Sequence, residues 1–300
     1  MFAMCANKML NCFAAHPRDA LIEFDAGPHK YTCMGEANYN SVTGWNHTHF
    51  PAFDADAIIA KMNLTNPKSK YYGQTPEQIK AGWDKGRDEA AEAGTAMHAA
   101  IEAFWIGGAP LEPPSGEGRT QGAEAEPSLP IEAHPSSRDR GAGACGAEGV
   151  SPHFGAFVAD NPQLKPYRTE WMIFDEDVRL AGSIDFVSEN EDGTLTIYDW
   201  KRCKEIKKAN GFGGYALTEC IAHLPDTNYW HYALQLNTYK AILERKYEKT
   251  VKHMFLVGLH PHLSKYQIYT VPNLAKEMAD LFALRAAQQQ AEQQQQQAVS

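Results

Sequence analysis

Three ionisable side chains interrupt two otherwise apolar strands near the middle of the chain. Asp185 falls in a predicted strand over 179–188, and Asp199 and Lys201 fall in the next, over 194–202. Charged groups are costly to bury unless they are paired or bind a metal. If the strands pair antiparallel, the two aspartates lie close together and repel each other unless a cation separates them. A hard divalent ion such as Mg²⁺ binds a few carboxylates and suits phosphate substrates.

The lysine fits the same chemistry. Residues two apart on a strand share a face, so Asp199 and Lys201 point one way while Tyr198 and Trp200 point the other way, into packing. A lysine beside a metal can position or deprotonate a water, or neutralise charge on a phosphate. The three residues therefore outline a site for phosphodiester hydrolysis. The plainer alternative is a solvated ion pair at a strand end.

The flanking sequence predicts the elements that position these residues. The second half of the chain predicts a short helix at 152–161, strands at 168–177, 179–188 and 194–202, a long amphipathic helix at 228–247, strands at 253–261 and 266–271, and a last helix from about residue 273. The first half predicts strands around 22–25 and 29–34 and helices at about 54–63, 76–82 and 86–105. This order predicts an α+β (α/β) fold in which helices flank a central mixed sheet.

Three segments lack the composition of a folded core. Residues 107–150 are rich in Gly, Pro, Ser and Glu, which predicts a disordered insertion because so few apolar groups cannot offset the entropy of ordering. Residues 291–300 form a glutamine-rich tail, and residues 1–20 predict a disordered leader with only a faint likeness to a transit peptide. A single domain is therefore expected over 21–290, interrupted by the insertion.

The bulk composition narrows the classes of protein. A hydrophobic fraction of 43% and a charged fraction of 22% are ordinary for a globular protein, and no apolar run is long enough to span a membrane. The net charge of -9 argues against coating nucleic acid by charge alone but leaves room for a local basic channel. Six scattered cysteines favour a reduced, intracellular setting (nucleus, mitochondrion or cytoplasm, or a viral protein). No P-loop motif is present, so no ATP-driven step is expected.

Further polar residues extend the pattern in a fixed order. In chain order they are His98 on a predicted helix that also carries Thr95, Glu170 on the first strand of the meander, Gly182 and Asp185 on the second, Asp199 and Lys201 on the third, and Gln235 and Tyr239 on the next helix. The series resembles the RecB-like branch of the PD-(D/E)xK nuclease superfamily, which shows Gly-x-x-Asp, Asp-x-Lys and Gln-x-x-x-Tyr in this order. It is similar to mitochondrial genome maintenance exonuclease-type and viral exonucleases, and "SVTG" at Ser41–Gly44 adds a weaker match.

The resemblance implies a restriction-endonuclease-like core, and it assigns a role to each of these residues. The implied catalytic residues are Lys201, Asp199, Asp185 and Glu170; the implied ligands of one or two Mg²⁺ or Mn²⁺ ions are His98, Asp185, Asp199 and the Trp200 carbonyl; and the implied DNA contacts are Gln235, Tyr239, Arg202, Lys204 and Thr95. Relatives with an iron–sulfur cluster use cysteines after the last of these helices, where this chain has none, so no cluster is expected. Loss of Lys201 is expected to abolish cleavage and leave folding nearly intact, since the residue faces the cleft.

The implied function is a metal-dependent DNA exonuclease acting on ends or single strands in replication, repair or recombination. A separate helicase or replication protein is a possible partner, and no membrane is expected. The alternatives are a structure-selective endonuclease, a subunit that binds DNA ends without cutting, and an assembly protein that works through its insertion and tail. The run "KRCKEIKK" (201–208) is either a basic lip for phosphates or a solvated loop. The aromatic residues at 215, 229, 230 and 232 either stack on bases or pack in the core.

Overall fold

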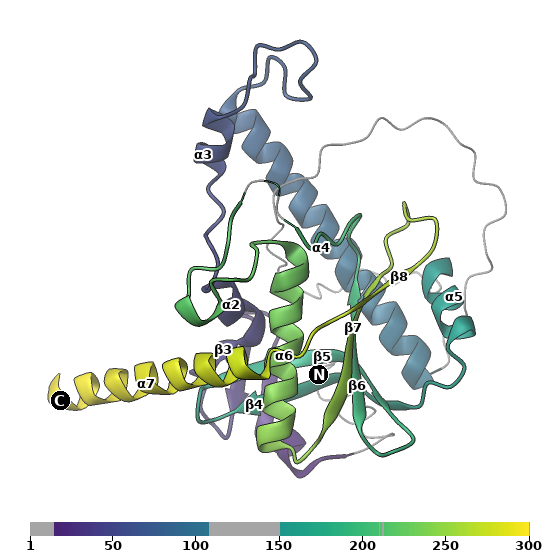
Figure 1. Cartoon of the computed structure of the whole chain (residues 1–300), viewed down its shortest axis with the longest axis vertical. Helices are drawn as coiled ribbons and strands as arrows, with labels where there is room; N and C mark the ends of the chain where they lie inside the picture. The colour runs from purple at the N-terminus through teal and green to yellow at the C-terminus, as the bar shows by residue number, and fades with distance from the viewer. Residues whose placement is uncertain (1–14, 108–150, 210, 212, 300) are drawn as a thin grey trace.

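A six-stranded mixed sheet forms the centre of the protein (Figure 1). The computed structural model describes residues 15–107, 151–209, 211 and 213–299. The strands are β3 (Asn40–Ser41), β4 (Pro166–Asp175), β5 (Leu180–Glu189), β6 (Leu195–Lys201), β7 (Val251–Gly258) and β8 (Gln267–Thr270). The β4–β5, β5–β6 and β7–β8 pairs are antiparallel, whereas β6–β7 is parallel because the chain crosses over through a helix. The predicted α+β fold with a central mixed sheet is confirmed.

Helices cover both faces of this sheet. On one face lie α4 (Pro76–Gly107) and α5 (Pro152–Asp160), which pack on Tyr198 and Trp200 in a cluster of buried apolar residues. On the other lies α6 (Asn228–Lys246), over the core cluster that contains Leu195 and Ile197. The alternation of side chains predicted along β6 is therefore confirmed. It places Asp199 and Lys201 on the α6 side.

The smaller elements surround this body. They are a 3-10 helix η2 (Pro17–Leu21), the hairpin β1 (Ile22–Asp25) and β2 (Lys30–Cys33), α2 (Val42–His47), α3 (Ala55–Ala60), a 3-10 helix η3 (Glu219–Ile221) and the last helix α7 (Ala275–Val299). The α7 helix begins against α6 and then runs away from the body, as Figure 1 shows. None of the helices in the described residues is long and apolar enough to cross a membrane.

The strands β5 and β6 separate at the end of the sheet where the candidate residues lie. β4 runs along one edge of β5, so β3 and β6 share the other edge. β3 pairs with residues 180–181 and β6 pairs with residues 186–189. Residues 182–185 of β5 therefore have no strand partner on this edge. Asp185 lies at the point of separation.

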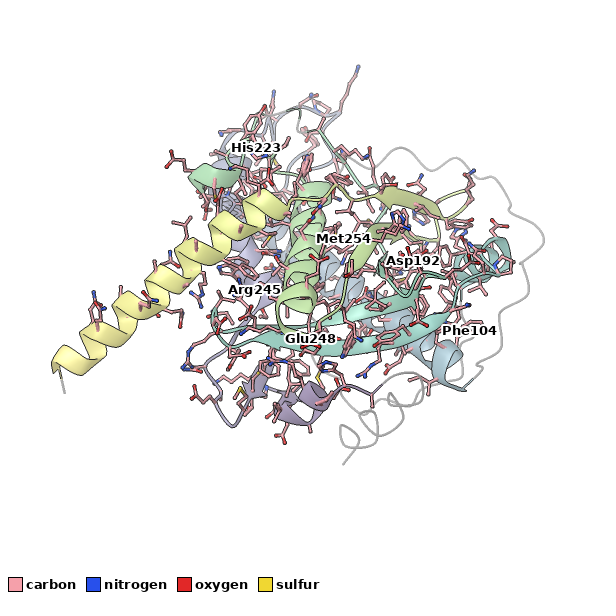
Figure 2. The ribbon with its side chains drawn as sticks, turned by 60° about the horizontal axis from the view of Figure 1, so that its bottom comes forward. Phe104, Asp192, His223, Arg245, Glu248 and Met254 are labelled. Carbon is pink, nitrogen blue, oxygen red and sulfur yellow. The ribbon has the colours of Figure 1, made fainter. Side chains whose placement is uncertain are left out.

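Ion pairs fix the far end of α6. Arg245 Nε lies 2.9 Å from the fully buried carboxylate of Asp175, and Lys246 Nζ lies 3.1 Å from Glu176 in the β4–β5 turn. Figure 2 labels Arg245 at this end of α6, facing the α7 helix, and its guanidinium lies 5.2 Å from the ring centre of Phe282. These contacts fix the position of this end of α6 relative to the sheet.

Two boundaries differ from the prediction. The helices expected at 76–82 and 86–105 form one continuous helix, α4, because residues 83–85 carry helix-compatible side chains and Arg87 bonds back to Asp84 at 2.8 Å. The ordered chain also begins before residue 21: Asp19 accepts bonds from Arg168 at 2.8 Å and from the Trp171 indole at 3.1 Å. Residues 1–14 of the expected leader and 108–150 of the expected insertion lie outside the described residues.

Candidate active site

Three polar side chains from three elements meet beside the separated strands. The ligand atoms of His98 on α4, Glu170 on β4 and Asp185 on β5 all lie within 4.8 Å of one another. The imidazole Nδ1 of His98 is 3.7 Å from Glu170 and 3.6 Å from Asp185. All three side chains are partly exposed, so the group is reachable from solvent.

The carboxylate of Asp185 takes the place of a missing backbone partner in the sheet. Its Oδ2 accepts a hydrogen bond of 2.8 Å from the backbone N–H of Trp200, at the point where β6 has left β5. The same oxygen faces His98. One carboxylate therefore satisfies a backbone donor of the sheet and contributes to the cluster.

Glu170 adopts a backbone conformation that is unusual for a strand. Its φ angle is +45°, in the left-handed region that residues with a Cβ rarely enter. On either side, Thr169 pairs with Phe186 and Trp171 with Ile184, which leaves Glu170 opposite Asp185. Ser183, two residues before Asp185, donates a 3.2 Å hydrogen bond to Glu170 Oε2. The local distortion turns the glutamate towards the cluster.

Electrostatics makes His98 a cation in the metal-free protein. Burial opposes the charged form, but the carboxylates of Asp185 and Glu170 outweigh it and raise the pKa of His98 to about 9. Burial, reinforced by the charge of Glu170, raises the pKa of Asp185 despite His98 and Lys201. A site in which acids crowd together and a histidine supplies the compensating charge is suited to a cation.

Asp199 and Lys201 form a separate, buried pair. The ammonium Nζ lies 2.7 Å from Asp199 Oδ2, and the two side chains are only 7% and 2% exposed. Burial raises the pKa of Asp199 to about 6, although Lys201 opposes the shift. The pKa of Lys201 is also raised: burial favours the neutral amine, but Asp199 and Asp185 outweigh it. The resting lysine is thus a cation, suited to stabilising a phosphate rather than to accepting a proton.

This placement bears on two sequence-based expectations. Asp199 does not join the three-residue group, because its carboxylate is directed to Lys201 at the end of β6. Lys201 is buried rather than exposed on a cleft wall, which corrects its expected position, while the effect of its removal on folding stays a prediction.

Tyr239 is buried against the strands, and Gln235 is half-buried beside it. Gln235 Nε2 donates to Tyr239 Oη at 3.1 Å, and Tyr239 is only 3% exposed. A Cβ on Gly182 would come within 2.8 Å of Tyr239 Cε1. The glycine of the Gly-x-x-Asp motif is therefore needed for Tyr239 to approach β5. The contact braces the strand that carries Asp185.

The other predicted DNA contacts lie around this centre. Thr95 is half-buried one turn before His98 on α4, Arg202 is half-buried and Lys204 is exposed just after β6. The loop after β6 is held to α6, since Lys207 N donates to Asn228 Oδ1 at 2.8 Å. Of the four aromatic residues, Tyr229 and Tyr232 are buried, Trp230 is partly buried and Tyr215 is 52% exposed.

The sequence argument missed several residues. Ser183 could have been found, because it shares a strand face with Asp185 two residues later. His231 could also have been found, because it lies four residues before Gln235 on the same stripe of α6. His47 carries no such signal, since only the fold brings α2 to α6.

The donor set fits a divalent metal ion. Two carboxylates and an imidazole from three different elements converge within 4.8 Å, and carboxylate oxygens are the ligands that Mg²⁺ and Mn²⁺ favour.

Comparisons with known proteins show the family of the chain. A family model of the PD-(D/E)XK nuclease superfamily matches residues 65–299, and the chain belongs to that superfamily. Among solved structures, the chain is similar to one described as "Putative exonuclease" from Eubacterium rectale, at 13% identity and a TM-score of 0.25. That alignment covers 44% of this chain and 57% of the other, little more than half of its length. Curated protein sequences give no match.

Proposed function

We propose that this phosphodiester hydrolase is a metal-dependent DNA exonuclease that acts on ends or single strands in replication, repair or recombination. The observation that carries the proposal is the group of His98, Glu170 and Asp185 beside the buried Lys201–Asp199 pair. Acidic ligands next to a fixed ammonium match the needs of phosphodiester hydrolysis, in which negative charge grows on the phosphate.

Each residue of the site has its own proposed role. His98, Glu170 and Asp185 would hold Mg²⁺ or Mn²⁺, with Asp199 and the Trp200 carbonyl as the further ligands proposed from the sequence. A bound ion would supply Lewis acidity towards the phosphate and favour ionisation of the attacking water. Lys201 orients that water and stabilises the charge on the five-coordinate phosphorus. Gln235 and Tyr239 hold β5 in place, while Thr95, Arg202 and Lys204 are proposed to contact the DNA backbone.

End-labelled DNA tests the proposal. Linear and closed circular substrates, single- and double-stranded, would be incubated with Mg²⁺, Mn²⁺ or EDTA. The expected result is loss of linear DNA that needs the metal and is absent in a Lys201→Ala protein shown by circular dichroism to be folded, and the labelled products give the polarity. Cutting of circles would replace the exonuclease with an endonuclease. Cleavage that persists in EDTA would overturn the metal dependence, and DNA binding by a folded protein without cleavage would replace the proposal with a binding subunit.

We also propose that the protein acts beside another DNA-processing protein. A nuclease without a P-loop would depend on a separate helicase or replication protein to unwind duplex DNA. Co-purification of such a protein with the full chain, tested with and without nuclease treatment to remove DNA bridges, would identify it.

A further inference from the structure

A second polar cluster lies next to Lys201, on the α6 side of the sheet. It consists of His47 at the end of α2, Asp226 just before α6, and His231 in the first turns of α6. Tyr232, the neighbour of His231, places its ring 4.5 Å from the Lys201 ammonium. The charge of Lys201 also acts on His47, so the cluster adjoins the lysine without belonging to the carboxylate group.

His231 is fixed on three sides. Its Nε2 lies 2.8 Å from Asp226 Oδ1, and its ring stacks on Phe50 with 3.9 Å between centroids. The side chain is nine-tenths buried, yet Nδ1 has no hydrogen-bond partner in the described part of the chain. A buried ring nitrogen without a partner is costly unless a ligand or a water satisfies it.

His47 is the more accessible of the two rings. It is half-buried and meets the His231 ring edge-on at 5.5 Å between centroids. Burial, together with the nearby His231 and Lys201 and against the opposing charge of Asp226, lowers the pKa of His47 to about 4. The ring is therefore a neutral hydrogen-bonding group held beside a cation. Thr238 Oγ1 bonds to Asn46 at 3.2 Å and fixes the α2 end against α6.

The surroundings favour an anion. The α6 helix has 19 residues and no acid in its first turn, so its free N–H groups carry partial positive charge. Its N-cap residue, Thr227, is only 4% exposed, makes no capping bond and leaves its hydroxyl without a partner among the described residues. Asp199 balances the adjacent Lys201, and Asp226 bonds to His231, so the region offers an anion the start of the helix and the Thr227 hydroxyl, which has no partner in the described residues.

We infer that His47, positioned by His231 and Asp226, binds a backbone phosphate of the substrate strand next to the phosphate that is cut. The inference rests on the proposed nuclease function and adds a subsite to it. A strand whose scissile phosphate reaches Lys201 continues over the adjoining α6 side, where the only half-buried neutral donor of the cluster is His47. The subsite would fix the register of the strand, whereas the carboxylate group performs the cleavage.

Methylphosphonate scanning tests this assignment. A single-stranded oligonucleotide series carries one neutral methylphosphonate at each position in turn, and cleavage by wild-type protein and by His47→Ala is compared. In the wild type, one position beside the cut should lower kcat/KM by about 10- to 100-fold, as expected for a bond to a charged group. In His47→Ala the unmodified strand should show the same loss of kcat/KM, and the methylphosphonate at that position should cause no further loss.

Two further variants separate contact from folding. His47→Gln keeps a hydrogen-bond donor and should restore most of the activity, whereas His253→Ala, exposed at the start of β7 and remote from the Lys201 end, should match the wild type. Thermal unfolding of His47→Ala within a few degrees of wild type shows that the fold is intact. Additive effects at every position, or equal losses along the whole strand, would overturn the subsite.

Binding of the same oligonucleotides in EDTA keeps the two proposals apart. If cleavage depends on Lys201 but the effects of His47→Ala and of the methylphosphonates are fully additive, the subsite alone is overturned. If the wild-type protein does not cleave but its binding shows the position-specific loss that depends on His47, the exonuclease is overturned and the subsite is kept. Wild-type protein that neither cuts nor binds any of the strands overturns both.

Discussion

The lysine of the Asp-x-Lys motif combines a place in the buried core with a proposed role in cleavage. Its ammonium is buried against Asp199 and over the Tyr232 ring, so the protein supplies its own counter-charge before substrate arrives. A phosphate entering the site has to compete with Asp199 for Lys201. Preorganised positive charge of this kind stabilises a transition state without reorganisation during the reaction.

Replacing this lysine should therefore affect stability as well as cleavage. Lys201→Met is expected to abolish activity and, at pH 8, to lower the free energy of unfolding by about 3–5 kcal/mol, because Asp199 is left buried and unpaired. A carboxyl whose folded pKa is raised gains protons on folding, and losing Lys201 raises the pKa of Asp199 above its wild-type value of about 6, so the penalty should shrink as the pH falls towards 6. Urea unfolding at pH 8 and pH 5 measures both values. The double variant Asp199→Asn/Lys201→Met should recover stability without activity; a single variant as stable as wild type at pH 8 would contradict the buried pair.

The carboxylate of Asp185 can be tested apart from its hydrogen bond. Asp185→Asn retains an oxygen that accepts from the Trp200 N–H but removes the charge. Metal binding should weaken strongly while the unfolding temperature stays close to wild type. Calorimetric titration with Mn²⁺ measures the affinity. Asp192→Asn, in the β5–β6 turn labelled in Figure 2, is the matched control and should bind like wild type; unchanged affinity in Asp185→Asn would exclude the carboxylate as a ligand.

At the scale of elements, the site depends on how closely α6 approaches β5. Gly182→Ala places a methyl group 2.8 Å from Tyr239, where neither the strand nor the helix can yield freely. The change should cost about 1–3 kcal/mol of stability and reduce cleavage, because Tyr239 braces the strand that carries Asp185. Gly82→Ala, on the exposed side of α4 with open space around it, should instead stabilise by about 0.5–1 kcal/mol. Thermal unfolding and cleavage rates of both variants distinguish packing from backbone effects.

The anchor at the other end of α6 predicts a specific acid sensitivity. Burial works against ionisation of Glu176, yet hydrogen bonds from Arg18 and Lys246 lower its pKa to about 2. A carboxyl with a depressed folded pKa stabilises the fold above its unfolded pKa, near 4.5, and loses that contribution as the pH falls towards 2. Glu176→Gln should therefore be less stable than wild type at pH 7 and equal to it near pH 2. Unfolding curves in urea across this range test the sign; a constant difference would contradict it.

For the molecule as a whole, the last helix contributes unequally along its length. Met278, Leu281 and Phe282 are buried in the core, and Arg285 bonds to Val178 O at 3.2 Å. The helix then leaves the body (Figure 1). Ending the chain after Gln289 should change the free energy of unfolding by no more than about 0.5 kcal/mol. Ending it after Asn273 should destabilise the protein severely; chemical denaturation of both truncations tests the boundary.

The sequence alone predicted the strands well and the site only in part. Alternation along 194–202 predicted the direction of each β6 side chain, because a period of two leaves little choice once the core face is set. The convergence of Glu170, His98 and Asp185 within 4.8 Å could not be read from spacing. It depends on where β6 leaves β5, and strand separation is a tertiary property. His47 reaches Lys201 only through packing of α2 on α6.

The hydrogen bond from Trp200 to Asp185 has an evolutionary consequence. An aspartate codon becomes an asparagine codon by one nucleotide change, and asparagine preserves the bond that closes the sheet. If Asp185 holds the metal as proposed, a single nucleotide change separates a protein with the full set of ligands from one that lacks a carboxylate and still closes the sheet in the same way.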